Sequence, residues 1–235
     1  MTVECGRRSR RDFVANVGRL ASAAALTACM NPVSHQGGAS TGSQPSPRGG
    51  EWDLSWIDRL AAATDRAVFD WPSIGDPGDP IVVEIAARYL DNCEAAYRAQ
   101  TYDARAVLNI RTRAVPAALN DALWERYALG AEYSVDDPVT RQPALRNPFW
   151  HRAPDPSPGV TLPTIEDLVQ RRAIILVCDF ALGHLAERLA ARGGRDADEV
   201  HRELRSGFVP GSFAVPSGIF GLARSQNAGC AYVRM

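Results

Sequence analysis

The sequence contains no lysine. All 26 basic residues among its 235 are arginine, which excludes a Schiff-base lysine and the lysine of a phosphate-binding P-loop. It also has no surplus of positive charge, because 27 acidic residues balance the arginines and leave a formal net charge of −1. Proteins that bind nucleic acid without sequence preference carry a marked basic surplus. We therefore expect no nucleic-acid partner.

Recognisable metal and nucleotide motifs are also missing. The four histidines and five cysteines show no H-x-x-H or C-x-x-C spacing, which a zinc site would favour. His184 and His201 fall on the polar flanks of expected helices, where exposure to solvent is the default. The glycines form neither a G-x-G-x-x-G fingerprint nor a Walker loop. We expect neither a metal ion nor a cofactor.

The first part of the chain has the pattern of a targeting signal and not of a folded domain. The stretch "SRRDFV" resembles a twin-arginine (Tat) export signature, with Arg10, Arg11 and Phe13 in its defining positions. Further on, "LTAC" resembles a bacterial lipobox, in which Cys29 would be lipidated after cleavage. Residues 1–29 are therefore interpreted as a signal peptide that sends the protein to the periplasm, with a membrane tether if Cys29 carries lipid. A basic, alanine-rich terminus without a targeting role is the alternative.

A flexible linker is expected after the signal. Residues 30–50 are rich in glycine, serine and proline and have almost nothing to bury, which is typical of a tether. The remaining residues, 51–235, have the apolar and charged content of an ordinary globular domain. They are numerous enough to bury a substantial core.

Residues 51–235 alternate between strand-like and helix-like segments. Apolar periodicity predicts helices at 81–98, 117–127, 180–192, 197–205 and 219–226. Strands are expected at 66–70, 104–111 and 173–177, and later at "SFAV" and "CAYVRM". This alternation predicts a Rossmann-like α/β domain of three layers, with a mostly parallel sheet of about five strands between helices.

One long segment does not fit a regular strand–helix unit. Residues 134–164 hold seven of the sixteen prolines and the stretch "RNPFWH". Long connections of this kind are usually functional, interfacial or disordered. Because Phe149 and Trp150 would be costly to leave in water, we expect an ordered arm that packs on this subunit or a neighbouring one.

Residues that could carry chemistry gather where the predicted strands end. In an open parallel sheet, ligands bind beyond the carboxyl ends of the strands. Cys178 ends the most apolar strand directly before a helix, whose N-terminus would stabilise a thiolate. Ser217 and Gly218 stand in the equivalent place before the next helix, as an N-cap and anion site. Arg111 ends another predicted strand and Arg113 follows it, so both could supply positive charge to the same edge.

A second interpretation of Cys178 stays open. Asp179 beside it would disfavour a thiolate and could itself cap the following helix, so Cys178 would be an inert, buried side chain. Cys93 lies on the apolar side of its helix and is expected to fill the core. Cys230 begins the last strand, at the opposite edge of a parallel sheet from Cys178, so a disulfide between them is not expected.

Four segments and their order resemble the DsrE/DsrF family, and more narrowly its exported branch with a twin-arginine signal. They are "AVLNIRTRAVPAALNDALWERYALG", "RNPFW", "AIILVCDFALGHLAERLA" and "VPSGIFGLARSQNAGCAYV". The resemblance covers residues 64–235 and implies a Rossmann-like domain that forms homo-oligomers. In sulfur-relay members a cysteine after the central strand carries a persulfide and exchanges sulfur with a partner protein, and Cys178 is in the matching position. Asp179 departs from the small or neutral residue often found there, and export departs from the cytoplasmic setting of those relays.

Two functions therefore remain. One is an exported protein that handles sulfane sulfur through Cys178, so that any enzymatic activity would be sulfur transfer, with Arg111 and Ser217 nearby. The other is a non-catalytic ligand-binding or scaffold subunit of the cell envelope, in which Cys178 only packs.

Overall fold

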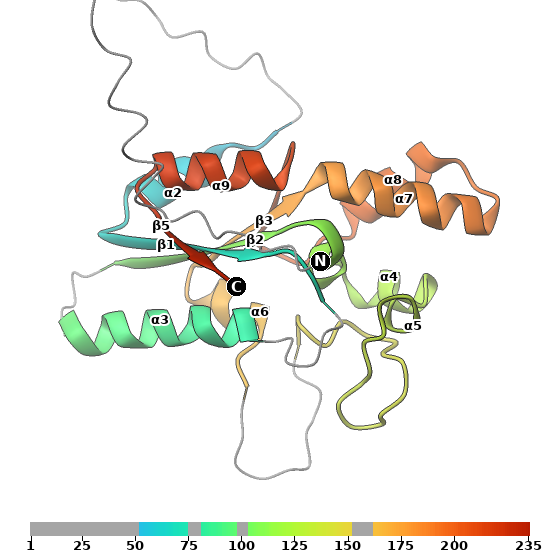
Figure 1. Ribbon diagram of the computed structural model, residues 1–235, viewed down its shortest axis with the longest axis horizontal. Coiled ribbons are helices and arrows are strands. Elements are labelled where there is room, and N and C mark those ends of the chain that lie inside the picture. The colour runs from blue at the N-terminus through green and yellow to red at the C-terminus, as the bar shows by residue number, and fades with distance from the viewer. Residues whose placement is uncertain (1–51, 75–80, 98–102, 152–161) are drawn as a thin grey trace, which may run out of the picture. The chain divides into compact units, whose positions relative to one another are not determined.

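The computed structural model describes residues 52–74, 81–97, 103–151 and 162–235 (Figure 1). The predicted signal peptide with Arg10, Arg11, Phe13 and Cys29, and the predicted linker, lie outside these residues. Within the described part of the chain, no helix is both long and apolar enough to cross a membrane.

A five-stranded sheet organises the domain. All neighbouring strands are parallel, in the order β4-β3-β2-β1-β5. The three interior strands are largely buried because helices cover both faces of the sheet, as is typical of parallel sheets. The strands are β1 (Asp65–Trp71), β2 (Ala104–Ile110), β3 (Ile174–Cys178), β4 (Ser212–Val215) and β5 (Ala231–Arg234).

The helices form a layer on each face of the sheet, so the predicted three-layer α/β architecture is confirmed. On one face the sheet packs against α3 (Ile81–Tyr97), α6 (Ile165–Gln170) and α7 (Asp179–Gly193). On the other face it packs against α2 (Ser55–Ala61) and α9 (Gly218–Asn227), which Figure 1 places opposite α3. Alternate residues of β1 divide accordingly: Phe69 belongs to the first core and Val68 to the second.

The connection between β2 and β3 differs from the sequence prediction. The single helix expected at 117–127 is wrong, because the chain forms a 3₁₀ helix η1 (Thr112–Ala118) and then α4 (Asp121–Arg126). Pro116 lies inside η1, and Asn120 starts the next helix afresh by accepting a hydrogen bond from the Leu123 amide at 3.1 Å. The short helix α5 (Leu129–Tyr133) follows α4, and α8 (Ala197–Ser206) follows α7.

The described part of the proline-rich arm packs on its own chain. Phe149 and Trp150 are both buried, and the Phe149 ring meets the edge of Trp71 at 5.5 Å between centroids. The buried side chain of Asn147 holds this turn in place. Its amide donates to the carbonyls of Ala117 and Leu119, and its oxygen accepts from the amides of Phe149 and Trp150.

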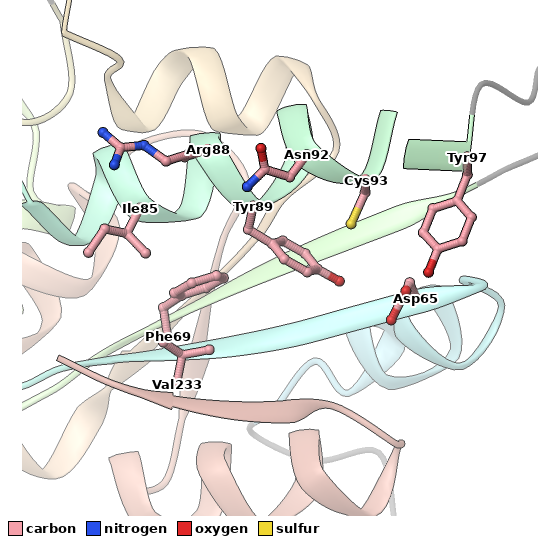
Figure 2. A pocket seen from close by; sticks show the side chains of 9 residues that line it. All are labelled: Asp65, Phe69, Ile85, Arg88, Tyr89, Asn92, Cys93, Tyr97 and Val233. Carbon is pink, nitrogen blue, oxygen red and sulfur yellow. The ribbon is translucent and has the colours of Figure 1, made fainter. Parts of the chain in front are cut away.

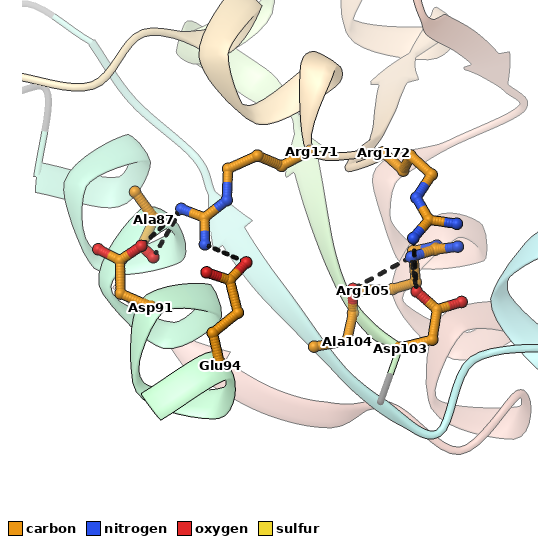
Figure 3. A network of polar contacts seen from close by, with 8 residues as sticks. All are labelled: Ala87, Asp91, Glu94, Asp103, Ala104, Arg105, Arg171 and Arg172. Carbon is orange, nitrogen blue, oxygen red and sulfur yellow. Dashed lines mark hydrogen bonds and ion pairs between the residues drawn. The ribbon is translucent and has the colours of Figure 1, made fainter. Parts of the chain in front are cut away.

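An arginine-rich network closes the amino end of the sheet (Figure 3). Arg171 contacts Asp91 and Glu94 of α3 at 2.8 and 3.1 Å, and Arg172 reaches Asp103 at 3.4 Å. These contacts fasten the turn between α6 and β3 to α3 and to the start of β2. The network is structural and lies at the opposite end of the strands from Cys178.

Candidate functional site

The candidate site lies where β3 and β4 end. These strands are adjacent, with Cys178 opposite Val215. From their carboxyl ends, α7 leaves toward one face of the sheet and α9 toward the other. Divergence of this kind opens the crevice in which parallel α/β proteins bind ligands. Cys178 and Ser217 are the N-cap residues of the two helices, so two partly positive helix ends meet at this edge.

The position of Cys178 has features of a reactive thiol and of a buried packing residue. Its Sγ accepts a hydrogen bond from the Ala181 amide at 3.4 Å, in the manner of an N-cap. An amide donor at a helix N-terminus stabilises a thiolate more than a thiol. However, the residue is only 5% exposed and belongs to the larger apolar core. The sulfur is thus at the predicted edge and hydrogen-bonded there, but almost covered.

Asp179 does not cap α7, contrary to the alternative considered from the sequence. Its Oδ1 lies 3.1 Å from His201 Nε2 and 3.8 Å from Arg205 Nε, both on α8. This contact also corrects the expectation for His201, whose side chain is half-covered rather than on a free surface. The carboxylate therefore turns toward α8, and Cys178 takes the capping position itself.

The side chain of Arg111 lies at this edge of the sheet, but its charge is paired with that of a carboxylate. Its guanidinium makes a two-pronged contact with Asp70 at the end of β1, with Nε–Oδ1 at 2.7 Å and Nη2–Oδ2 at 2.8 Å. Asn109 and Tyr232 also donate to the same carboxylate, at 3.3 and 3.2 Å. Arg111 is near enough to Cys178 for the two to interact electrostatically. Arg111 thus lies at the predicted edge, against Gly218, but Asp70 offsets its charge.

The pKa values of this pair follow from the same contacts. Burial alone would raise the pKa of Asp70, but hydrogen bonds from Arg111, Asn109 and Tyr232 and the Arg111 charge outweigh it and hold the pKa below its ordinary value. The hydrogen bond to Asp70 raises the pKa of Arg111. Both groups are therefore ionised at neutral pH, as a joined pair across β1 and β2.

Ser217 and Gly218 shape the second helix end. The Ser217 hydroxyl accepts from the Phe220 amide at 3.2 Å, which confirms the predicted N-cap. Gly218 is needed because a Cβ there would lie 2.7 Å from the Cβ of Arg111. The amide of Phe180 donates to the carbonyl of Pro216 at 3.3 Å and joins the two loops across the crevice.

Arg113 faces a separate pocket beside α7. Its guanidinium lies over the ring of Tyr133 at 5.4 Å, and the residue before it, Thr112, has a left-handed backbone with φ 47°. Such a conformation in a β-branched residue costs about 1–3 kcal/mol and is concentrated at functional sites. The pocket encloses about 280 Å³ and is lined by Thr112, Arg113, Glu132, Tyr133, Phe180, Ala181, His184 and Arg188.

Of the predicted site residues, Cys178, Asp179, Arg111, Ser217 and Gly218 come together, whereas Arg113 lines the adjoining pocket. Sequence reasoning did not assign the residues that surround them. The strand prediction places Asp70 at this edge of the sheet, but it gives the residue no role. The other surrounding residues had no sequence signal, because each contacts a partner from a distant element. They are Asn109, Tyr232, His201, Tyr133 and Arg188.

The other two described cysteines lie away from this edge. All three are free and buried, and burial raises the pKa of Cys230 to about 12. Cys93 lines a shallow hollow of about 390 Å³ between α3 and the edge strand β5 (Figure 2). There it lies near Tyr89, whose pKa burial raises well above its ordinary value. The prediction that Cys93 is buried on its helix is confirmed.

Comparison with known proteins assigns no role to the chain. No family model matches the chain, and no curated protein matches it. A similar solved structure is the protein of unknown function MTH1491 from Methanobacterium thermoautotrophicum, with 15% sequence identity and a TM-score of 0.36. The match covers 73% of this chain and 99% of the other.

Proposed function

We propose that the protein belongs to the exported branch of DsrE/DsrF-like proteins and handles sulfane sulfur through Cys178. The observation that supports this most is the Sγ of Cys178 at the N-cap of α7, within hydrogen-bonding distance of the Ala181 amide. A deprotonated sulfur in this place gains an amide donor and the positive end of a helix. The N-terminus of α9 at the same edge adds to the favourable field, whereas the charge of Arg111 is offset by Asp70.

The proposed step is a sulfur transfer without net oxidation or reduction. The Cys178 thiolate attacks the terminal sulfur of an inorganic polysulfide, and the S–S bond behind that sulfur breaks. A Cys178 persulfide anion forms, and the polysulfide leaves one sulfur shorter with both its negative charges. A thiolate of a partner protein then attacks the outer sulfur and regenerates Cys178. Because the residue is 5% exposed, only a small donor, or a donor admitted by local opening of the α7 end, can reach it.

A second function has its own supporting observation. Cys178 is packed within the apolar core, as expected of a non-catalytic cell-envelope subunit that binds a small ligand or serves as a scaffold. In that case the sulfur contributes packing and a helix cap. Replacing it by alanine would then lower stability without changing ligand binding or assembly.

Mass spectrometry of the full-length protein after exposure to polysulfide distinguishes sulfur transfer from the non-catalytic function. Sulfur transfer predicts the mass of one additional sulfur atom on the peptide that contains Cys178, and none on the peptides of Cys93 and Cys230. Cys178→Ser should lose the addition, and Cys93→Ser serves as the matched control that keeps it. An unmodified Cys178 in folded protein, under conditions that modify a small thiol, would reject sulfur transfer and favour the second function.

We further propose that residues 1–29 direct export to the periplasm and that Cys29 is a lipidation site. Intact-mass measurement of protein recovered from a bacterial envelope fraction tests both: a chain that starts at Cys29 with a bound lipid supports the tether. A chain that keeps residues 1–29 in the cytoplasm would contradict export. As for other DsrE/DsrF-like proteins, we propose a homo-oligomer, which sedimentation of the same material would detect.

A further inference from the structure

The pocket beside the N-terminal half of α7 combines two features that one kind of ligand would satisfy. One wall is cationic, with Arg113 from η1 and Arg188 from α7. Another wall is aromatic, with Tyr133 from α5 and Phe180 from the first turn of α7. Three elements distant in sequence contribute these side chains, so the pocket is a product of the tertiary fold.

The positive charge of the pocket is only partly offset by its own lining, in which Glu132 is the one acidic residue. Among the residues that the structure describes, Arg113 forms no ion pair, and its guanidinium lies over the Tyr133 ring. Arg188 donates to the Tyr133 hydroxyl at 2.8 Å, while its contact with Glu132 is long, at 3.9 Å. Glu132 instead binds Arg192 at 2.6 Å. The pocket therefore presents one unmatched guanidinium and a second that is weakly matched.

The apolar side of the pocket is unusually accessible. Phe180 is 66% exposed although it is a large aromatic residue, and its ring meets His184 edge-to-face at 4.6 Å. Tyr133 is nearly covered, and burial raises its pKa, so its hydroxyl is neutral and keeps a proton to donate. An aromatic group resting on Phe180 would cover apolar surface that is now in contact with water.

We propose that this pocket binds a small organic anion, an aromatic ring that carries a carboxylate or sulfonate. The oxyanion would lie against Arg113 and Arg188, and the ring against Phe180. An enclosed space of about 280 Å³ is close to the lower end of the size range of small-molecule sites. This inference does not rest on the reactivity of Cys178, because Cys178 is not among the lining residues.

Isothermal titration calorimetry of the full-length protein with benzenesulfonate and benzoate tests the proposal. Either ion should bind, while the uncharged benzenesulfonamide and inorganic sulfate should each bind at least about tenfold more weakly, since each lacks one half of the recognition. Arg113→Gln should weaken benzenesulfonate about tenfold. Phe180→Ala should weaken benzenesulfonate but leave sulfate unchanged.

Arg224→Gln is the matched control, because Arg224 is an exposed arginine of α9 on the other helical layer, and it should bind like the original protein. Thermal melts without ligand must agree among the variants, so that a loss of binding is not a loss of folding. Equal binding of sulfate and benzenesulfonate would overturn the proposal, as would unchanged binding in Arg113→Gln. Dissociation of an oligomer by Phe180→Ala would also overturn it, since Phe180 would then be an interface residue.

Discussion

The contact between Asp70 and Arg111 should stabilise the fold asymmetrically. The side chain of Asp70 is 4% exposed, whereas that of Arg111 is 30% exposed. Removing one partner of a buried ion pair costs about 3–5 kcal/mol, because the other charge is left without compensation. Arg111→Met leaves the more deeply buried charge of Asp70 without its cation, and we expect a destabilisation of about 3–5 kcal/mol. Asp70→Asn leaves a guanidinium that water can partly solvate, and we expect a smaller cost of about 2–3 kcal/mol.

The pH dependence of the same pair has a definite sign. The pKa of Asp70 is lowered in the folded protein, while an unfolded aspartate has a pKa of about 3.9. The stabilisation from Asp70 is therefore complete above about pH 4 and is lost as the pH falls through the lower, folded value. The stability difference between the original protein and Asp70→Asn should shrink only below about pH 4.

Urea unfolding followed by tryptophan fluorescence measures these free energies, at neutral pH and along an acid series. Both single variants and the double variant complete a double-mutant cycle. A coupling free energy near zero would refute the reasoning, and so would a cost of Asp70→Asn that exceeds that of Arg111→Met. A stability difference that stays constant from pH 7 to pH 2 would refute the pH argument alone.

Three further predictions concern single residues. Gly218→Ala should destabilise the fold by about 1–3 kcal/mol in urea unfolding, because its Cβ would press on the Arg111 side chain. Gly183→Ala, in α7 where a Cβ meets open space, should be neutral or stabilising by up to about 1 kcal/mol. Equal effects of the two substitutions would be inconsistent with this reasoning. Asn147→Asp should cost about 2–4 kcal/mol in the same assay, since a carboxylate cannot donate to the carbonyls of Ala117 and Leu119, and a neutral effect would mean that the arm is held by its aromatic residues alone. Cys230, with its pKa raised to about 12, should be the slowest of the described thiols to react with iodoacetamide at pH 8. At that pH only about one molecule in ten thousand carries the Cys230 thiolate. Rapid labelling of Cys230 in folded protein would contradict its burial.

The sequence pattern was sufficient for the sheet because inner parallel strands must be apolar on both faces. The run "AIILVC" therefore identified β3 and located Cys178 at its end. The same pattern could not reveal which residues line the pocket beside α7. Tyr133 belongs to a five-residue helix with left-handed residues, Ala128 and Ser134, at its two ends. Neither alanine nor serine signals that conformation, so only the tertiary fold brings Tyr133 to the pocket.

The side chain of Asp70 shows the second limit of sequence reasoning. Its position at the end of a strand is visible in the sequence, but its partners are not, because they come from β5 and from the end of β2. The predicted role of Arg111 as a cation for a ligand omitted Asp70 for this reason. A local pattern identifies a charge, whereas the charge that faces it depends on strand order.

The pairing of β1 with β5 affects how the protein is made. Tyr232 lies 162 residues beyond Asp70 in the chain, so β1 is an open sheet edge until the ribosome has produced β5. A chain that stops short of β5 would expose the backbone of β1 beside the apolar Val68 and Phe69. Unpaired apolar edges attract other chains, so incomplete products should aggregate or be degraded rather than persist as soluble fragments.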